Sequence, residues 1–106
     1  MVKRGEIWLA SLDPTVGSEI QKTRPCVIVS PAEIHDYLKT VIVAPMTTGS
    51  KPAPYRIPVT FQKKKGLILL DQIRAIDKTR LVKKMGEATD KTLTQTLDTL
   101  QEVFAE

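Results

Sequence analysis

The sequence has only one cysteine and one histidine among its 106 residues. A single cysteine excludes an internal disulfide, and Cys26 lies in an apolar run, so we expect a small, buried hydrophobic side chain. A single histidine, His35, excludes any mechanism that needs two, and we assign it no role. Because the acidic residues are scattered, the chain offers no cluster of metal ligands. We therefore expect no metal and no other cofactor.

Long apolar runs are also lacking. No segment approaches the ~18 consecutive apolar residues of a membrane-spanning helix, and the N-terminus has no signal-peptide pattern. These absences predict a cytoplasmic protein without a membrane partner. A chain of 106 residues is typical of one domain, here residues 1–106, which is large enough to bury a core without disulfides.

Positive charge is concentrated in the middle of the chain. The formal net charge is +4, but residues 51–84 carry ten basic and two acidic side chains, whereas residues 85–106 carry one basic and five acidic side chains. A basic middle segment favours a polyanion or an acidic protein as the partner.

Short apolar or alternating runs, separated by proline, glycine and polar turns, predict five or six strands. The runs are residues 6–12, 25–29, 41–46, 55–61, 67–73 and 81–86. Pro45 in the third run implies a bend or an edge position. The turns are too short for parallel crossovers, so we predict a mainly β fold whose antiparallel sheet curls into a small barrel.

Two helices complete the predicted fold. Ser30 caps and Pro31 opens a short inserted helix that ends near Tyr37. Thr89 or the residue after it caps a C-terminal helix, whose apolar face would contact the core or a second subunit. The residues of that face are Leu93, Leu97, Leu100 and Phe104.

The most polar stretch between two predicted strands is the loop from residue 17 to 25, which contains Glu19, Lys22 and Arg24. Pro25 disfavours the helical region for the residue before it, so Arg24 should be extended at the start of the second strand. A charged residue held at a strand end suits chemistry, although an ordinary solvated loop has the same composition.

Six motifs, in order along residues 4–104, resemble the PemK/MazF toxins of bacterial toxin–antitoxin systems. The motifs are Gly5-Glu6-Ile7-Trp8, Leu12-Asp13-Pro14-Thr15, Gly17-Ser18-Glu19, Thr23-Arg24-Pro25, Pro45-Met46-Thr47 and the run from Leu70 to Lys78. The resemblance implies an SH3-like barrel, a homodimer, and a sequence-specific, metal-independent endoribonuclease that cuts single-stranded RNA (an mRNA interferase). It also implies an acidic, partly disordered antitoxin that covers the RNA groove, with operator DNA contacted only through that antitoxin.

The resemblance assigns catalytic roles to four positions. The family's arginine before proline is Arg24, and its threonine after the third strand is Thr47. Its glutamate in the first loop is Glu19, and the acidic residue that some members carry in the fifth strand is Asp71. Where some members have a second catalytic arginine this chain has Leu69, so that version of the acid–base pair cannot operate here.

These residues suit RNA cleavage by attack of a 2′-hydroxyl on the adjacent phosphorus. The fork of Arg24 can bind two phosphate oxygens at once, and the Thr47 hydroxyl can donate to a phosphate oxygen. Glu19 and Asp71 compete for the role of base, and either could instead bind a nucleobase edge. An ion pair between Glu19 and Arg24 would lower the pKa of the carboxyl and weaken it as a base.

Further polar residues of the loops and the fifth strand are candidate RNA contacts. They are Ser18, Gln21, Lys22, Thr48, Ser50, Lys51 and Gln72. Ser18 stands where some members have a histidine, and residues 20–23 replace glycines, so the loop should be stiffer and more basic. Because the chain has only two tyrosines, two phenylalanines and one tryptophan, bases should be read mainly by hydrogen bonds.

Two alternatives remain open. A gyrase-poisoning toxin of the same barrel fold would act through an aromatic residue and a glycine near the C-terminus, a pattern that is absent from the final residues 103–106. A non-catalytic RNA-binding barrel would keep the basic surface, and replacing Arg24 would then weaken binding without a separate loss of cleavage.

Overall fold

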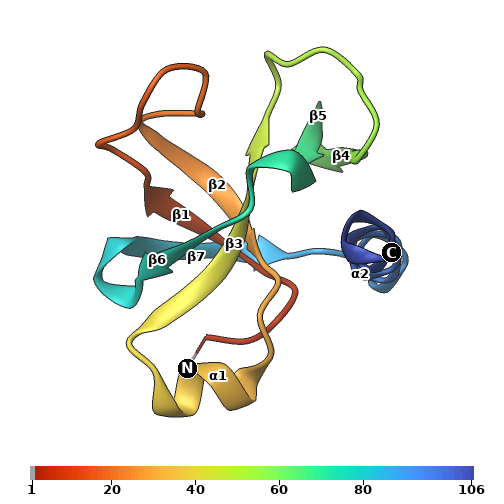
Figure 1. Ribbon diagram of the computed structural model, residues 1–106. Coiled ribbons are helices and arrows are strands. Elements are labelled where there is room, and N and C mark those ends of the chain that lie inside the picture. Colours follow the sequence, from red (N-terminus) through yellow and green to blue (C-terminus); the bar gives the residue numbers. More distant parts are fainter. Residues whose placement is uncertain (1) are drawn as a thin grey trace.

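Seven strands make up most of this computed structural model, which describes residues 2–106. Every pair of neighbouring strands is antiparallel, in the order β4-β5-β3-β2-β1-β7, and β6 pairs with β3. The strands are β1 (Glu6–Ser11), β2 (Thr23–Ile28), β3 (Thr40–Thr47), β4 (Arg56–Phe61), β5 (Lys64–Leu69), β6 (Arg74–Asp77) and β7 (Leu81–Glu87). The sheet curls into a half-barrel (Figure 1), which confirms the predicted mainly β, antiparallel fold.

The central strand β3 has two different partners on one of its edges. Its first half pairs with β6 up to Val43, and its last two residues pair with β5 from Met46. Pro45 is buried between these two segments, where the ladder on that edge changes partner. A residue without an N–H is tolerated there, so Pro45 marks a change of partner within a central strand.

The predicted fifth strand, residues 67–73, is wrong in its second half. β5 ends at Leu69, and Leu70–Gln72 form a single 3-10 turn, η1, before the chain returns as β6. The apolar run continues through Leu70, which is 1% exposed, so the pattern does not reveal the break. A second 3-10 turn, η2 (Lys78–Arg80), forms the turn before β7.

The inserted helix α1 spans Ala32–Tyr37, close to its predicted bounds, but its predicted cap is wrong. Pro31 occupies the N-cap position and no side chain caps the helix. The Ser30 hydroxyl instead lies 2.6 Å from His35 Nε2 and accepts a hydrogen bond from the Ile42 backbone. The buried His35 therefore packs α1 against β3, and Ser30 is committed to the same contact.

The C-terminal helix α2 spans Asp90–Phe104 and is capped by Thr89, whose hydroxyl accepts from the Thr92 backbone. The predicted apolar face is only partly correct. Thr96 is fully buried, whereas Phe104 is 71% exposed. The helix lies beside β4 at the edge of the sheet (Figure 1), so its last turn extends beyond the core.

A buried carboxylate, Glu6, begins β1. It is 4% exposed and accepts hydrogen bonds from the Lys3 backbone and the Trp8 indole, and Lys84 Nζ lies 3.0 Å from its Oε2. Burial alone would raise the pKa of Glu6, but the bonds from Trp8, Lys3 and Lys84 outweigh it and hold this pKa below the usual value.

Replacing Glu6 by glutamine should destabilise the protein by about 1–3 kcal/mol at pH 7, the cost of weakening hydrogen bonds to a buried charged group. Because the folded-state pKa is lowered, this stabilisation is fully present above the usual pKa of 4.5 and is lost as the pH falls through the lower folded value. Urea unfolding at pH 7 and pH 3 would check this, since the difference between the two proteins should shrink in acid. An equal difference at both pH values would contradict it.

Candidate active site

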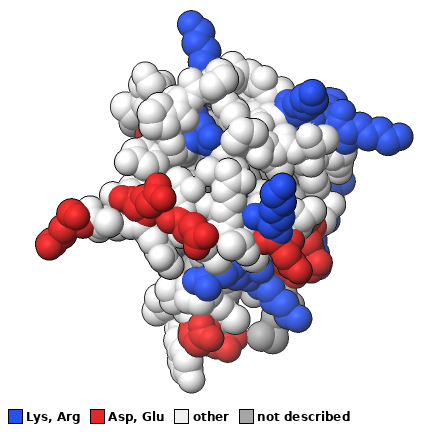
Figure 2. Space-filling model, turned by 90° about the vertical axis from the view of Figure 1, so that its right-hand side faces the viewer, with Lys and Arg blue, Asp and Glu red and all other residues white. Residues whose placement is uncertain are grey.

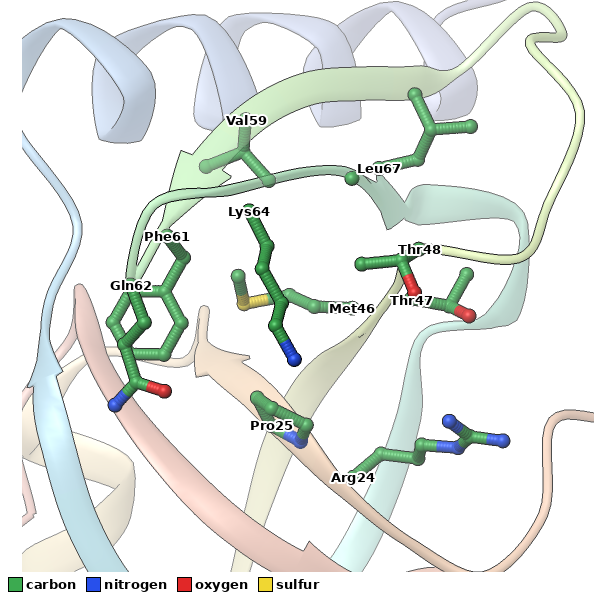
Figure 3. Close-up of a pocket in the computed structure, with 11 residues that line it drawn as sticks. Arg24, Pro25, Met46, Thr47, Thr48, Val59, Phe61, Gln62, Lys64 and Leu67 are labelled. Atoms are coloured by element: carbon green, nitrogen blue, oxygen red, sulfur yellow. The ribbon is translucent and has the colours of Figure 1, made fainter.

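A shallow pocket of about 190 Å³ lies where β2 and β3 meet the β4–β5 hairpin. Arg24 and Thr47 lie at one end of it, and Phe61 and Gln62 lie at the other (Figure 3). The full lining is Arg24, Pro25, Met46, Thr47, Thr48, Val59, Phe61, Gln62, Lys64, Gly66 and Leu67. The pocket thus has a polar, charged end at Arg24 and Thr47, and an apolar floor.

The pairing of β2 with β3 explains why Arg24 and Thr47 meet. Cys26 pairs with Pro45 in this antiparallel ladder, and continuing the register by two residues brings Arg24 opposite Thr47. Arg24 lies in β2, as the following Pro25 predicts. Its side chain is half-buried, and its Nε donates to the Gln21 carbonyl at 3.2 Å. The guanidinium is therefore held by the backbone of its own loop and lies on the pocket.

Thr47 is the last residue of β3. Its Oγ1 accepts a hydrogen bond from the Gly49 backbone at 3.2 Å, which leaves the hydroxyl hydrogen available to donate. The neighbouring strand approaches closely here, because a Cβ on Gly66 would lie 2.7 Å from the Thr47 carbonyl oxygen. The position of Thr47 thus depends on a glycine across the ladder.

A second hollow, of about 170 Å³, contains the two predicted carboxylates. It is lined by Glu19, Ile20, Asp71, Gln72, Ile73 and Arg74. The structure therefore brings Glu19 and Asp71 together, but it does not place them in the lining of the pocket that holds Arg24.

The predicted ion pair between Glu19 and Arg24 is wrong. Three salt bridges occur within residues 2–106, and neither residue takes part in any of them. Glu19 Oε1 instead accepts from the Val16 backbone at 2.6 Å. The carboxylate closes its own turn, because an acceptor three residues from a backbone donor is easily satisfied locally.

Asp71 forms a two-point ion pair with Arg56, the first residue of β4. Nε of Arg56 lies 3.1 Å from Oδ1 of Asp71, and Nη2 of Arg56 lies 3.0 Å from Oδ2. These hydrogen bonds lower the pKa of Asp71. The sequence analysis assigned no role to Arg56. Its place in the basic middle segment was the only sign of a function, and its partner Asp71 lies 15 positions away in the sequence.

Six of the seven predicted RNA contacts lie in two loops, which follow β1 and β3. These loops rise from the same end of the sheet, opposite α1 (Figure 1). Ser18, Gln21 and Lys22 are exposed in the first loop. Thr48, Ser50 and Lys51 lie in the second, where Ser50 is half-buried and the other two are exposed. The seventh, Gln72, lies in η1 and accepts from the Ile20 backbone at 2.7 Å.

Charged side chains are distributed unevenly over the face that carries α2. Figure 2 shows mostly Lys and Arg at its upper end, and carboxylates among further Lys and Arg over its middle and lower part. α2 and its flanks supply exposed Asp90, Asp98, Glu102 and Glu106. The end of the molecule with the two loops is thus the one suited to a negatively charged ligand.

Three further features of residues 2–106 concern metal ligands, the single thiol and membrane spans. No group of three or more histidine, cysteine or carboxylate side chains is placed to hold a metal. Burial raises the pKa of Cys26 to about 12, so this thiol stays protonated at neutral pH, as expected for a packing residue. Across the same residues, no helix has the length and apolar character needed to span a bilayer.

Comparisons with known proteins find a family and relatives by sequence. Residues 3–104 match the family described as PemK-like, MazF-like toxin of type II toxin–antitoxin system. A relative from Staphylococcus epidermidis, named Endoribonuclease MazF, is 42% identical over 91 residues, which cover 80% of this chain and 76% of the relative.

Solved structures share the fold. MazF from Deinococcus radiodurans superposes with a TM-score of 0.87 at 21% identity, covering 99% of this chain and 97% of that one. A mycobacterial endoribonuclease, solved in complex with its cognate antitoxin, gives a TM-score of 0.80 at 20% identity, covering 96% of this chain and 93% of that one. The present chain therefore belongs to the PemK-like, MazF-like family of type II toxins.

Proposed function

We propose that this protein is the toxin of a type II toxin–antitoxin pair and acts as an endoribonuclease on single-stranded RNA. The observation that carries the proposal is the juxtaposition of Arg24 and Thr47 at the open end of the pocket. Membership of the toxin family and the 42% identity to a protein named Endoribonuclease MazF support it.

In the proposed reaction the 2′-oxygen of the substrate bonds to the adjacent phosphorus and the bond to the 5′-oxygen breaks. The 2′-hydroxyl loses its proton, and the departing 5′-oxygen gains one. Negative charge builds up on the two non-bridging phosphate oxygens, where the fork of Arg24 can bind both and the Thr47 hydroxyl can donate to one of them. Stabilisation of this charge is the main catalytic contribution of the pocket.

Glu19 is the better of the two predicted bases. Both carboxylate oxygens of Asp71 are bound by Arg56, and its pKa is lowered, so it is a poor proton acceptor at neutral pH. Within residues 2–106 the Glu19 carboxylate accepts one hydrogen bond, from the Val16 backbone in its own loop. RNA that displaces this bond would place a carboxylate beside the reacting hydroxyl.

The partners follow from the same surface. RNA would lie across the pocket between the two polar loops, whose Lys22 and Lys51 can contact phosphates. An antitoxin with an acidic, partly disordered segment would compete for this basic end of the molecule. We further propose that the toxin works as a homodimer, as the family resemblance implies.

The test is incubation of the purified protein with a long single-stranded RNA in EDTA, followed by mapping of the cut ends. We expect discrete cuts that leave 2′,3′-cyclic phosphate or 3′-phosphate ends, because the attacking oxygen belongs to the substrate and the proposed reaction uses no metal. Activity that disappears in EDTA and returns with a divalent cation would contradict the metal-independent mechanism. Intact RNA over many unrelated sequences would contradict the proposed activity.

A further inference from the structure

The 3-10 turn η1 reaches both of the loops that rise from the RNA-facing end of the sheet. Its two neighbouring residues Asp71 and Gln72 are bonded in two different directions. Asp71 is bound to Arg56 at the start of β4, and Gln72 is bound to the backbone of Ile20 in the β1–β2 loop. One short turn therefore contacts segments that are far apart in the sequence.

Arg56 extends the first of these contacts to the β3–β4 loop. Its Nε and Nη2 donate to the Asp71 carboxylate, while its Nη1 donates to the Lys51 carbonyl at 3.2 Å. On the ladder Arg56 lies opposite Leu69, the last residue before η1. The planar guanidinium thus joins η1 to the loop with three hydrogen bonds, a geometry that a lysine cannot reproduce.

Gln72 makes the second contact. Its side-chain oxygen accepts from the Ile20 N–H at 2.7 Å, across 52 positions of sequence. The side chain of Ile20 is half-buried against the cluster formed by Ala10, Leu12 and Cys26. This hydrogen bond therefore secures the β1–β2 loop just before Arg24, beside the turn that Glu19 closes.

We propose that Arg56, Asp71 and Gln72 are positioning residues, and that η1 holds the two RNA-binding loops at a set separation before RNA arrives. The inference rests on the proposed function and deepens it. The backbones of Arg24 and Thr47 belong to β2 and β3, although the Arg24 guanidinium also bonds to Gln21 in the loop that Gln72 secures. We therefore expect the contacts that Arg56 makes to η1 and to the β3–β4 loop to act mainly on RNA binding, because loops ordered in advance bind at a lower entropic cost.

Hydrogen exchange of the free protein tests the positioning directly. In Arg56→Gln and Arg56→Lys, backbone amides of residues 48–55 should exchange about fivefold faster or more, while residues 13–22 stay at the wild-type rate. In Gln72→Leu the pattern should reverse. Gln72→Glu is the matched control, since a carboxylate still accepts from Ile20 and should keep the wild-type rate. If amide exchange in these variants became faster throughout the chain, or became faster in neither loop, the proposal would be overturned.

Cleavage kinetics provide the functional readout. Arg56→Gln should raise KM for RNA by about three- to tenfold, because binding must then order the loop, and should leave kcat within about twofold of wild type. The exchanged double variant Arg56→Asp/Asp71→Arg restores the ion pair but has no donor at position 56 for the Lys51 carbonyl, so it should recover KM and amide protection only in part. A fall in kcat with unchanged KM, or wild-type amide protection of residues 48–55 in Arg56→Gln, would overturn the proposal. If no variant cleaves RNA, the proposed function fails, yet the exchange data still decide whether η1 positions the loops.

Discussion

Arg24→Ala should reduce RNA cleavage by about 10²–10³-fold or more, with little change in the fold. The estimate follows from the loss of a preorganised donor for the charge that develops in the transition state. Arg24 is half-buried, and within the described residues 2–106 its guanidinium bonds only to the Gln21 carbonyl of its own loop, so its removal leaves the core intact. Single-turnover cleavage of one labelled RNA, with circular dichroism and a thermal unfolding curve, measures both effects.

Two variants sharpen this experiment. Arg24→Lys keeps the positive charge but loses the fork that binds two oxygens, so it should recover only part of the rate. Lys39→Ala removes one positive charge from the exposed segment between α1 and β3, at the end of the molecule opposite the two loops (Figure 1) and outside the pocket lining, and should cleave like wild type. Full activity in a folded Arg24→Ala protein would remove Arg24 from the mechanism. An equal loss of rate in Lys39→Ala would show that net charge, rather than the pocket, is responsible.

Gly66→Ala should damage both stability and cleavage. The added Cβ would lie 2.7 Å from the Thr47 carbonyl oxygen and 3.3 Å from the Thr47 carbonyl carbon. These are backbone atoms of a central strand, so they cannot move aside cheaply, and we expect a loss of about 1–3 kcal/mol in unfolding free energy. Any backbone movement that relieves this close contact shifts Thr47. A displaced catalytic group can cost ~10²-fold in rate. Urea unfolding and single-turnover cleavage, run side by side, measure the two losses.

Gly49→Ala is the matched control. A Cβ at Gly49 would have only the Thr47 hydroxyl nearby, at 3.8 Å, which is ordinary contact, and the backbone N–H that binds this hydroxyl is retained. Stability and cleavage should therefore stay near wild type. A Gly66→Ala protein with wild-type stability and activity would show that β5 can shift away from β3 without moving Thr47.

The candidate site divides into a part that local sequence predicts and a part that it does not. Arg24 was placed correctly at the start of a strand because Pro25 restricts the residue directly before it. The Glu19 ion pair was wrong because the nearest donor to that carboxylate is the backbone of Val16. Competition between a neighbouring N–H and a more distant guanidinium depends on how the loop closes, and residue types alone do not describe this.

By itself, the sequence determined the fold class and the family. Alternating apolar runs with short turns allow only antiparallel neighbours, and the motif order identified the family. Tertiary structure decided the pairings: Arg56 with Asp71, Gln72 with Ile20, and Gly66 against Thr47. Each joins residues 15 or more positions apart. The reason is physical, because a hydrogen bond or a close approach requires atoms to meet in space, and only the register of the curled sheet brings these atoms together.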